Sequence, residues 1–533
     1  MLARPSRRLA SAFALRACAI LLGLCALGAT FLPLSACSLG NIKRDDCSSN
    51  EQCVQTIGPA SSCQDGYCTD PPACKTGHDC RKSAGGGACV DGVCVSVFPK
   101  DAQCSTIVEP ANLLDQRLAG PDAPLVIGSI FSLDNEKDEI LTRAVRLAVR
   151  EINNKGGKMN RGQSLAVVAC DNGGPGNSAT GQERDALNNH AIDYLAGTLG
   201  VPYIVGPLSS SDSLRLIARI KEKNYPTVVI SPSATSPALT QADDRLAPNE
   251  PGLFWRTCPS DLQQGEVMAT NVITPDMTVN KVAVVYVSDA YGQGLAKVFQ
   301  DNYLMGTTQL FPIDDTKLMD PVALGQVATD VETYAPNGVL VITVQAGQTV
   351  SILNAMVGKA FVPSSKFFFT DGAKDAGVLL DPMLAPAVKA IIAASKGTAP
   401  ASPAGQTYDL FRANMNAEFN VEASAYSFLA QAYDATYVGA YGVIWASRET
   451  TNYDGREVAT GMGKLSAGAS VAIDVTLWPT GRTALTSDQS IDLQGTSGTL
   501  QFDPATGEAP GRIEIWSIDP MTGMFKTETV ITP

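Results

Sequence analysis

The 533-residue sequence contains only two histidines, His78 and His190, and lacks the usual signatures of a catalytic site. Neither a Gly-x-Ser-x-Gly elbow nor a His-Glu-x-x-His pair occurs in the chain. The stretch Gly461-Met462-Gly463-Lys464 is similar to the end of a phosphate-binding loop, but Leu465 stands where that loop needs Ser or Thr. These absences predict a protein that is not an enzyme and holds no cofactor or metal.

The sequence also has no excess of positively charged residues. Lys and Arg number 40 against 53 Asp and Glu, which gives a net charge of −13. Phosphate backbones and anionic lipid surfaces repel such a protein, so nucleic acid is not an expected partner. Beyond residue 36 the sequence also has no apolar run long enough to span a bilayer.

The first 36 residues differ from the rest. Four arginines precede or flank an apolar stretch, residues 17–32, which ends in Leu34-Ser35-Ala36-Cys37. A basic head, an apolar middle and small residues before a cleavage point are typical of an export signal. Because LSAC resembles the lipobox of bacterial lipoproteins, we expect residues 1–36 to be a signal peptide and Cys37 to be the lipidated first residue. An ordinary signal peptide or an uncleaved anchor is the alternative.

This resemblance implies a location in the cell envelope, on the periplasmic or surface side, with contact to a membrane through the lipid. Ser38 differs from the aspartate that retains lipoproteins in the inner membrane, which favours the outer membrane. Residues 37–46 are then a linker between the anchor and the folded part.

A cysteine-rich neck, residues 47–104, follows the linker. Its cysteines form two copies with gaps of five, nine and four residues and of five, eight and four residues: Cys47, Cys53, Cys63 and Cys68, then Cys74, Cys80, Cys89 and Cys94. Modules this short cannot bury a sufficient core, so we predict two disulfides in each, with the connectivity open. A zinc site is the less favoured alternative, since no Cys-x-x-Cys knuckle occurs.

The neck resembles cysteine-rich repeats that follow lipoboxes in some bacterial surface lipoproteins. We interpret it as a stiff spacer, with a protein-docking module as the second possibility. Outside these copies, Cys104, Cys170 and Cys258 remain. Their odd number requires at least one free thiol or an unexpected partner.

From about residue 123 the sequence alternates between strand and helix patterns. Continuous apolar runs of strand length are separated by segments with helical spacing, as in residues 125–130 followed by residues 140–152. Buried strands separated by helices predict parallel sheets with helices on both faces. About 400 residues of this pattern indicate two α/β lobes.

The body resembles the type I periplasmic binding proteins, the receptor-ligand-binding family of leucine/isoleucine/valine-binding proteins. Six phrases match in family order: IGSIFSLD…AVRLAVREINNKGG, YIVGPLSSSDSLRLIARI, YPTVVISPSATSPALT, FWRTCPSDLQQGEVMA, KVAVVYVSDAYGQG and GTLQFDPATGE. The resemblance implies two doubly wound parallel-sheet lobes joined by three crossings, with the ligand between them. We assign residues 123–257 and about 395–490 to the first lobe, and residues 258–394 and about 491–533 to the second.

Two turns offer hydroxyl groups at the carboxyl ends of strands, where open parallel sheets bind ligands. They are residues 206–211 and residues 231–235, and both are rich in Ser and Thr. Backbone amides and hydroxyls that converge at a helix start suit a carboxylate. The alternative is that these serines only cap helices.

The family resemblance assigns roles to five residues, three of them in these turns and two later in the chain. Ser210 and Thr235 match positions that hold the ligand carboxylate, and Ser233 matches one with backbone contacts. Tyr291 matches an aromatic that closes over the ligand, and Asp371 matches the acid that pairs with the ligand ammonium. The chain departs from the family at residues 131–134, which lack the Gly-rich threonine segment. It departs again at residues 345–347, where an aromatic is common.

Arg256 and Asp261 match a crossing between the lobes, and we interpret both as structural. The first functional hypothesis is a lipid-anchored solute-binding protein that captures a small amino-acid-like ligand for an ABC permease. The second is a regulatory or scaffolding lipoprotein that uses the same fold to bind a protein such as a cell-wall enzyme. The cysteine-rich neck motivates the second hypothesis.

Overall fold

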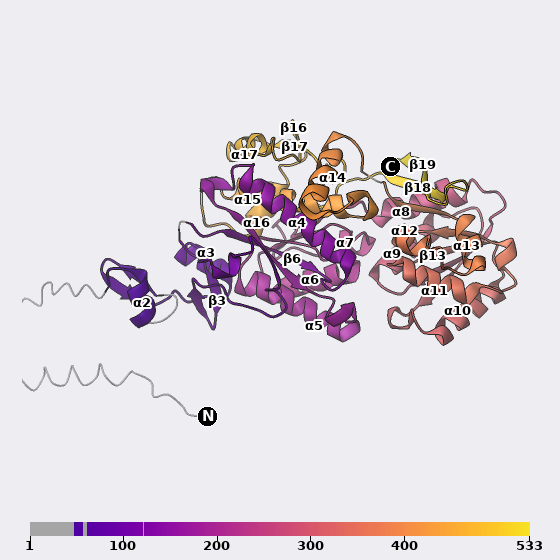
Figure 1. Cartoon of the computed structure of the whole chain (residues 1–533), viewed down its shortest axis with the longest axis horizontal. Coiled ribbons are helices and arrows are strands. Elements are labelled where there is room, and N and C mark those ends of the chain that lie inside the picture. Colours follow the sequence, from indigo (N-terminus) through magenta and orange to yellow (C-terminus); the bar gives the residue numbers. More distant parts are fainter. Residues whose placement is uncertain (1–46, 57–60, 121, 402, 533) are drawn as a thin grey trace, which may run out of the picture.

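The computed structural model describes residues 47–56, 61–120, 122–401 and 403–532. The predicted signal peptide, Cys37 and the linker lie outside these residues. Three parts follow one another along the long axis of the molecule: the neck, lobe 1 and lobe 2 (Figure 1). Within the described residues, no helix is both long enough and apolar enough to cross a membrane.

Lobe 1 comprises residues 105–256 and 406–509 and is built on a six-stranded sheet in the order β10-β9-β8-β6-β7-β5. The strands are β5 (Ile107–Glu109), β6 (Leu125–Phe131), β7 (Leu165–Asp171), β8 (Tyr203–Val205), β9 (Val228–Ser231) and β10 (Phe254–Arg256). All pairs are parallel except β5 with β7. Every residue of β6 is buried, as expected for a central strand with helices on both faces.

Helices cover both faces of this sheet. They are α4 (Glu136–Asn154), α5 (Gly181–Ile192), α6 (Ser210–Lys223), α7 (Pro237–Thr240), α14 (Gln406–Phe419), α15 (Leu429–Ala446), α16 (Gly455–Met462) and α17 (Trp478–Thr486). A small parallel pair, β16 (Ala469–Ala472) and β17 (Ile491–Gln494), completes the lobe. Helix α4 begins where the Asn135 side chain accepts a hydrogen bond from the Lys137 amide at 3.0 Å.

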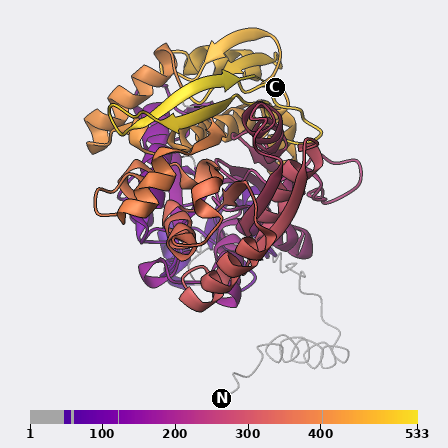
Figure 2. The same cartoon turned by 90° about the vertical axis from the view of Figure 1, so that its right-hand side faces the viewer.

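Lobe 2 comprises residues 261–400 and 513–531 and has a seven-stranded sheet in the order β12-β11-β13-β14-β15-β18-β19. Its strands are β11 (Lys281–Val287), β12 (Thr307–Ile313), β13 (Gly338–Ile342), β14 (Lys366–Phe369), β15 (Lys396–Pro400), β18 (Ile513–Ile518) and β19 (Phe525–Ile531). The helices are α8 (Asp261–Val267), α9 (Ala290–Asn302), α10 (Pro321–Tyr334), α11 (Ala346–Met356), α12 (Ala376–Leu379) and α13 (Pro386–Ala393). The C-terminal hairpin β18–β19 (yellow) runs along one edge of this lobe (Figure 2).

The predicted fold, two doubly wound α/β lobes with three crossings, is confirmed, with antiparallel strands added at the sheet edges. Two of the expected boundaries differ from the structure. Strand β15 lies in the sheet of lobe 2, although residues from 395 were assigned to the first lobe. Leu493, Leu500, Phe502 and Ala509 belong to the core of lobe 1, although residues from 491 were assigned to the second. Hydrophobic spacing marks strands but does not say which sheet a strand joins.

A pair of glycines provides a test of packing between α15 and the sheet of lobe 1. A Cβ atom on Gly439 would lie 2.4 Å from the ring of Tyr203, which is fully buried in β8. We expect Gly439→Ala to lower the free energy of unfolding by about 1–3 kcal/mol, because the core has no room for the methyl group. Urea denaturation would measure this effect.

Gly325 in α10 is the matched control, since a Cβ atom added there would have no neighbouring atom within 4 Å. Gly325→Ala is expected to raise stability by about 0.5–1 kcal/mol through helix propensity alone. Equal effects of the two substitutions would contradict the packing of α15 on Tyr203.

Each copy of the neck forms a small disulfide-bonded module. The first module has α2 (Asn50–Thr56), β1 (Ser62–Gln64) and β2 (Tyr67–Thr69), and the second has α3 (Gly77–Ala84), β3 (Ala88–Val90) and β4 (Val93–Val95). The disulfides are Cys47–Cys63 and Cys53–Cys68 in the first module, and Cys74–Cys89 and Cys80–Cys94 in the second. The prediction of two disulfides per module is confirmed, and these eight sulfur atoms are already bonded to one another in pairs.

The second module is packed against lobe 1, at the end farthest from lobe 2 (Figure 1). The ring of His78 is buried, and its Nε2 lies 3.0 Å from the Thr227 hydroxyl next to β9. Arg81 lies over the ring of Tyr453 and donates to the carbonyl of Gly200. The second module is thus part of the surface of lobe 1, which differs from the interpretation of the whole neck as a stiff spacer.

The contact at His78 predicts a pH dependence. Complete burial lowers the pKa of His78 to about 3 from its ordinary value of 6.5. Between these two values the unfolded chain binds more protons than the folded one, so the stability from this contact falls as the pH decreases from about 6.5 towards 3. Hydrogen exchange of residues 74–95 is therefore expected to accelerate relative to lobe 2 across this range.

The variant His78→Asn removes the titration but keeps a polar group near Thr227. Its hydrogen exchange in residues 74–95 is expected to lose the extra acceleration at acidic pH. If the native chain and this variant respond identically between pH 6.5 and 4, the buried position of His78 is wrong.

Candidate functional site

Two neighbouring serines in the turn between β8 and α6 have different roles: one caps the helix, and the other is available for ligand contact. Ser209 is the cap of α6, because its hydroxyl accepts a hydrogen bond from the Asp212 amide at 3.0 Å. Ser210 lies one residue further and does not cap the helix; its hydroxyl accepts from the Ser236 amide at 3.2 Å. An accepting hydroxyl keeps its own proton for another acceptor. Ser210 can therefore donate to a carboxylate.

The second turn, after β9, is held in shape by its own hydroxyl groups. The Ser231 hydroxyl accepts from the Ala234 amide at 3.0 Å and donates to the Pro207 carbonyl at 2.6 Å. Ser233 donates to the carbonyl of Leu208 at 2.8 Å, which ties the two turns together. Both predicted turns thus form one rigid rim at the carboxyl end of the sheet in lobe 1.

Asp261 lies below this rim. The Thr235 hydroxyl donates to its Oδ2 at 2.9 Å, and its backbone amide donates to the Thr235 carbonyl at 2.9 Å. Its other oxygen, Oδ1, is buried without a hydrogen-bond partner in the described part of the chain. Burial, together with the nearby charge of Asp371, raises the pKa of Asp261 well above its ordinary value.

Arg256 makes contacts only of a structural kind within the described residues. Its buried guanidinium donates to the carbonyls of Ala234 and Ser236, each at 3.0 Å, and forms an ion pair with Glu508 at 2.5 Å. Because Glu508 lies near the end of lobe 1, just before the third crossing, Arg256 links the ligand-facing turn of lobe 1 to the segment that leads into the hinge.

Lobe 2 contributes a tyrosine and a carboxylate that contact each other. The Tyr291 hydroxyl donates to Asp371 Oδ1 at 2.6 Å and lies 2.9 Å from the Thr370 hydroxyl. Gln264 Nε2 donates to the same carboxylate oxygen at 2.7 Å. Burial raises the pKa of Asp371, and these two hydrogen bonds oppose that rise. A ligand ammonium beside Asp371 would favour the charged form.

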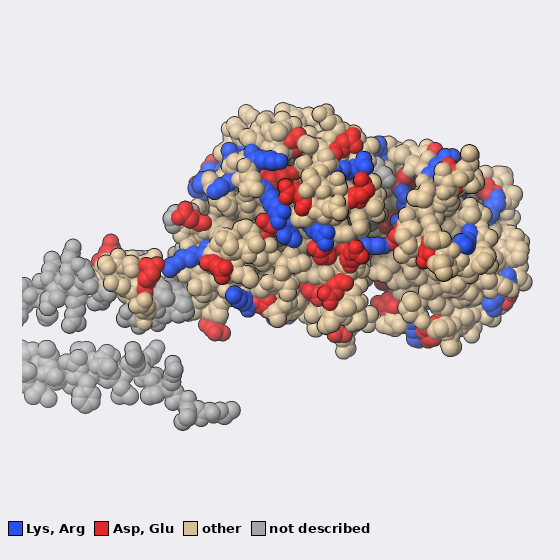
Figure 3. All heavy atoms as spheres, viewed as in Figure 1, with Lys and Arg blue, Asp and Glu red and all other residues tan. Residues whose placement is uncertain are grey.

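The five residues predicted for the site, Ser210, Ser233, Thr235, Tyr291 and Asp371, all line one cavity between the lobes, about 450 Å³ in volume. The first three come from lobe 1 and the last two from lobe 2. On the face in Figure 3, acidic and basic side chains are interspersed where the lobes meet. Among the predicted residues, those of lobe 1 bring hydroxyls to the cavity, and those of lobe 2 bring a tyrosine and a carboxylate.

The lobes touch each other at the edge of this cavity. Lys137 on α4 forms an ion pair with Asp375 of lobe 2. At a second point the Ser236 hydroxyl donates to the Ala290 carbonyl at 2.7 Å, and the Ala290 amide donates to the Ser211 hydroxyl at 3.2 Å. These contacts hold the cavity between two walls that face one another.

Sequence reasoning missed several residues that line the cavity, among them Lys137, Asp138, Arg184, Asp289, Lys374 and Phe428. Asp138 and Asp289 stand in the first turn of α4 and at the start of α9, which both follow strand ends. Their position at a helix start after a strand end was the signal in the sequence that could have identified them. The departures noted in the sequence also reach the cavity, through Ser132 and through Gln345, Ala346 and Gly347.

Comparison with known proteins places this geometry in a family. A model of the receptor family ligand binding region matches residues 140–521. The Leu/Ile/Val-binding protein BraC3 of Rhizobium johnstonii is 31% identical over 153 residues, 29% of this chain and 36% of that protein. The leucine-specific-binding protein of Salmonella typhimurium is 27% identical over 189 residues, 36% of this chain and 45% of that protein. The matches span less than half the length of these two relatives.

Solved structures share the fold. The branched-chain amino acid transporter substrate-binding protein LivJ of Streptococcus pneumoniae, in complex with isoleucine, has a TM-score of 0.56 at 19% identity over 77% of this chain and 100% of that one. A solute-binding protein of an ABC transporter from R. palustris, in complex with benzoate, has a TM-score of 0.53 at 15% identity over 77% and 97%. The chain belongs to the receptor ligand-binding family, and its two lobes have the type I periplasmic binding protein fold.

Proposed function

We propose that this chain captures a small amino-acid-like ligand between its lobes and delivers it to an ABC importer. The observation that carries the proposal is the arrangement of two unlike walls around one cavity. The Ser210 hydroxyl, which keeps its own proton, suits the ligand carboxylate, and Asp371 suits the ligand ammonium. A charge-assisted hydrogen bond at each end would orient an amino acid across the cleft.

The proposal also includes the anchor. Lipidation of Cys37 would hold the chain at the membrane beside its permease, and the export signal would place it outside the cytoplasm. Relatives named for leucine, isoleucine and valine binding, and a fold neighbour solved with isoleucine, support transport of this class of ligand. Mass spectrometry of the N-terminal peptide purified from membranes would test the lipid on Cys37.

Thermal unfolding with a ligand panel tests the binding function. The chain without residues 1–36, with Cys37→Ser, would be heated with amino acids, short peptides and small aromatic carboxylates. A ligand at a hundred times its dissociation constant adds about 2.7 kcal/mol to the stability of the folded state. A shift with amino acids supports the proposal, while a shift confined to aromatic carboxylates would replace its ligand class.

A second function, binding of a protein partner, is favoured by the first cysteine-rich module. That module projects beyond lobe 1 on the side away from the cleft (Figure 1), where a partner can reach it. Crosslinking in membranes followed by affinity capture separates the two functions. Recovery of permease subunits supports transport, and recovery of cell-wall enzymes, with no shift across the ligand panel, supports scaffolding.

A further inference from the structure

The cavity between the lobes has an excess of acidic groups. Among the charged residues that line it, four are aspartates, namely Asp138, Asp289, Asp371 and Asp375, and three are basic, namely Lys137, Arg184 and Lys374. A zwitterionic amino acid brings no net charge into this space. The ligand side chain that the cavity favours therefore depends on which of these charged residues already pair with one another within the protein.

Each basic residue is already engaged by an acid. Lys137 forms an ion pair with Asp375, and Lys374 forms one with the buried Glu514. Arg184 is bound by Asp212, with Nη2 2.8 Å from Oδ2 and Nε 3.3 Å from Oδ1.

Three aspartates are left without a basic partner of their own. In the described part of the chain, Asp138, Asp289 and Asp371 form no ion pair with a lysine or arginine side chain. The remaining amino group of Arg184 donates to the Ser132 hydroxyl at 3.0 Å. The ligand ammonium can offset only one of the three, Asp371.

Of the remaining two aspartates, Asp138 is the better candidate to bind a positive charge on the ligand. Asp289 caps α9 by accepting from the Gly292 amide at 2.7 Å, which satisfies one of its oxygens. Asp138 stands in the first turn of α4, on the lobe 1 wall, and belongs to no cap. Burial raises the pKa of each of these two carboxyl groups to about 6, and at Asp138 the nearby charge of Arg184 and hydrogen bonds from Ser132 oppose that rise without cancelling it.

A second observation concerns Asp261, which lies behind the cavity wall at Thr235. Asp261 Oδ1 is buried and accepts no hydrogen bond in the described residues, while Oδ2 is bound by Thr235, which lines the cavity. The cavity walls also carry apolar side chains, among them Leu141, Leu208, Val344, Val378 and Phe428, which suit the methylene stem of a long basic side chain.

We propose that the cleft selects amino acids with a cationic side chain, of the lysine, ornithine and arginine class, and that Asp138 receives the distal positive charge. This inference rests on the proposed solute-binding function and names its substrate class. Gln345, Ala346 and Gly347 line the cavity at the position where relatives often have an aromatic. Complementary charge gives the selectivity, because a neutral side chain leaves the Asp138 carboxylate desolvated and unpaired.

Isothermal titration of the chain without its signal peptide, with Cys37→Ser, tests this with a matched pair of ligands. L-Lysine and L-norleucine have the same straight stem and differ in the terminal ammonium. We expect L-lysine to bind at least tenfold more tightly than L-norleucine, and L-glutamate to bind more weakly than either.

The variant Asp138→Asn is expected to reduce the ratio of the lysine and norleucine affinities at least tenfold. Asp330→Asn, the same charge change at an exposed position on α10, is the control and is expected to keep the ratio. Circular dichroism would confirm that both variants are folded.

The outcomes distinguish this inference from the proposed function. Tighter binding of L-norleucine than of L-lysine overturns the cationic class but leaves amino-acid capture standing. An unchanged ratio in the Asp138→Asn variant overturns the role of Asp138. Failure of a folded chain to bind any amino acid overturns the proposed function itself.

Discussion

Asp371→Ala is expected to abolish measurable binding of an amine-bearing ligand. Asp371 is the acid that lines the cavity on lobe 2 beside Tyr291, and the proposed ligand brings its ammonium to this carboxylate. Removing one partner of a desolvated charge pair leaves the other charge buried and unpaired, which typically costs about 2–5 kcal/mol. Isothermal titration with the best ligand of the panel would measure the loss.

Asp371→Asn separates the loss of charge from a loss of local structure. The amide oxygen of Asn can still accept the hydrogen bonds from Tyr291 and Gln264, which the carboxylate now accepts at 2.6 and 2.7 Å. We expect this variant to unfold as the native chain does and yet to bind at least tenfold more weakly. Asp330→Ala on α10 is the control for removal of an acid. Unchanged affinity in Asp371→Ala would refute the role of Asp371.

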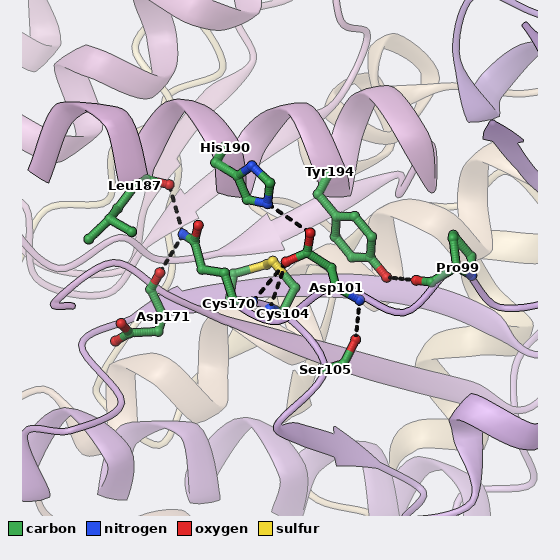
Figure 4. The surroundings of a disulfide bond; sticks show 10 residues. Pro99, Asp101, Cys104, Ser105, Cys170, Asp171, Leu187, His190 and Tyr194 are labelled. Carbon is green, nitrogen blue, oxygen red and sulfur yellow. Dashed lines mark hydrogen bonds and ion pairs between the residues drawn. A yellow bond between two sulfur atoms is a disulfide. The ribbon is translucent and has the colours of Figure 1, made fainter. Parts of the chain in front are cut away.

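Replacing both Cys104 and Cys170 with alanine is expected to destabilise lobe 1 by about 4 kcal/mol. The two cysteines are fully buried and form a disulfide that joins the end of the neck to the end of β7 (Figure 4). It closes a loop with a sequence separation of 66 residues. In the chain-entropy model a crosslink over such a loop contributes roughly 4 kcal/mol by restricting the unfolded chain.

Hydrogen bonds that do not involve the two sulfur atoms surround this disulfide, and we expect them to form in the double variant as well. The Asp171 amide donates to the Gln103 carbonyl at 2.9 Å, and the Gln103 side chain donates to the Leu187 carbonyl at 2.8 Å. Nearby, His190 is half exposed and lies 2.8 Å from Asp101 (Figure 4). The double variant is therefore expected to fold with the native secondary structure and to unfold at lower urea concentration.

Cys258→Ala is the matched control, because Cys258 is equally buried but forms no disulfide within the described residues. Its effect is expected to be well below that of the double variant, since only one sulfur atom and its packing are lost. A double variant as stable as Cys258→Ala would show that the disulfide contributes nothing to lobe 1.

Much of the site could be predicted because its residues follow strand ends. Buried apolar strands and helical spacing indicated parallel sheets, whose carboxyl ends form one edge. Ser210 and Thr235 stand at that edge after neighbouring strands, β8 and β9, so their proximity follows from topology. Tyr291 and Asp371 were found through family resemblance, since nothing in their local sequence separates them from other turn residues. Their common cavity was visible only in the structure.

Other features depend on contacts between segments far apart in the chain. The odd number of Cys104, Cys170 and Cys258 indicated at least one free thiol or an unexpected partner, but it did not say which cysteine would be free. Likewise the partners Lys137 and Asp375 are separated by more than two hundred residues and belong to different lobes. Charge compensation inside the cavity, and with it the inference about the ligand side chain, therefore had to come from the structure.

The sequence by itself determined the α/β class, the family, the two disulfide-bonded copies of the neck and the strand ends that carry the ligand-facing hydroxyls. These depend on local periodicity and on spacing along the chain, which neighbouring residues specify. Only the tertiary structure decided which cysteines pair, where the hinge crossings lie, how the second neck module packs on lobe 1 and which aspartates lack a basic partner. Those properties are set by distances between remote residues, because burial and charge pairing arise only after the lobes have packed.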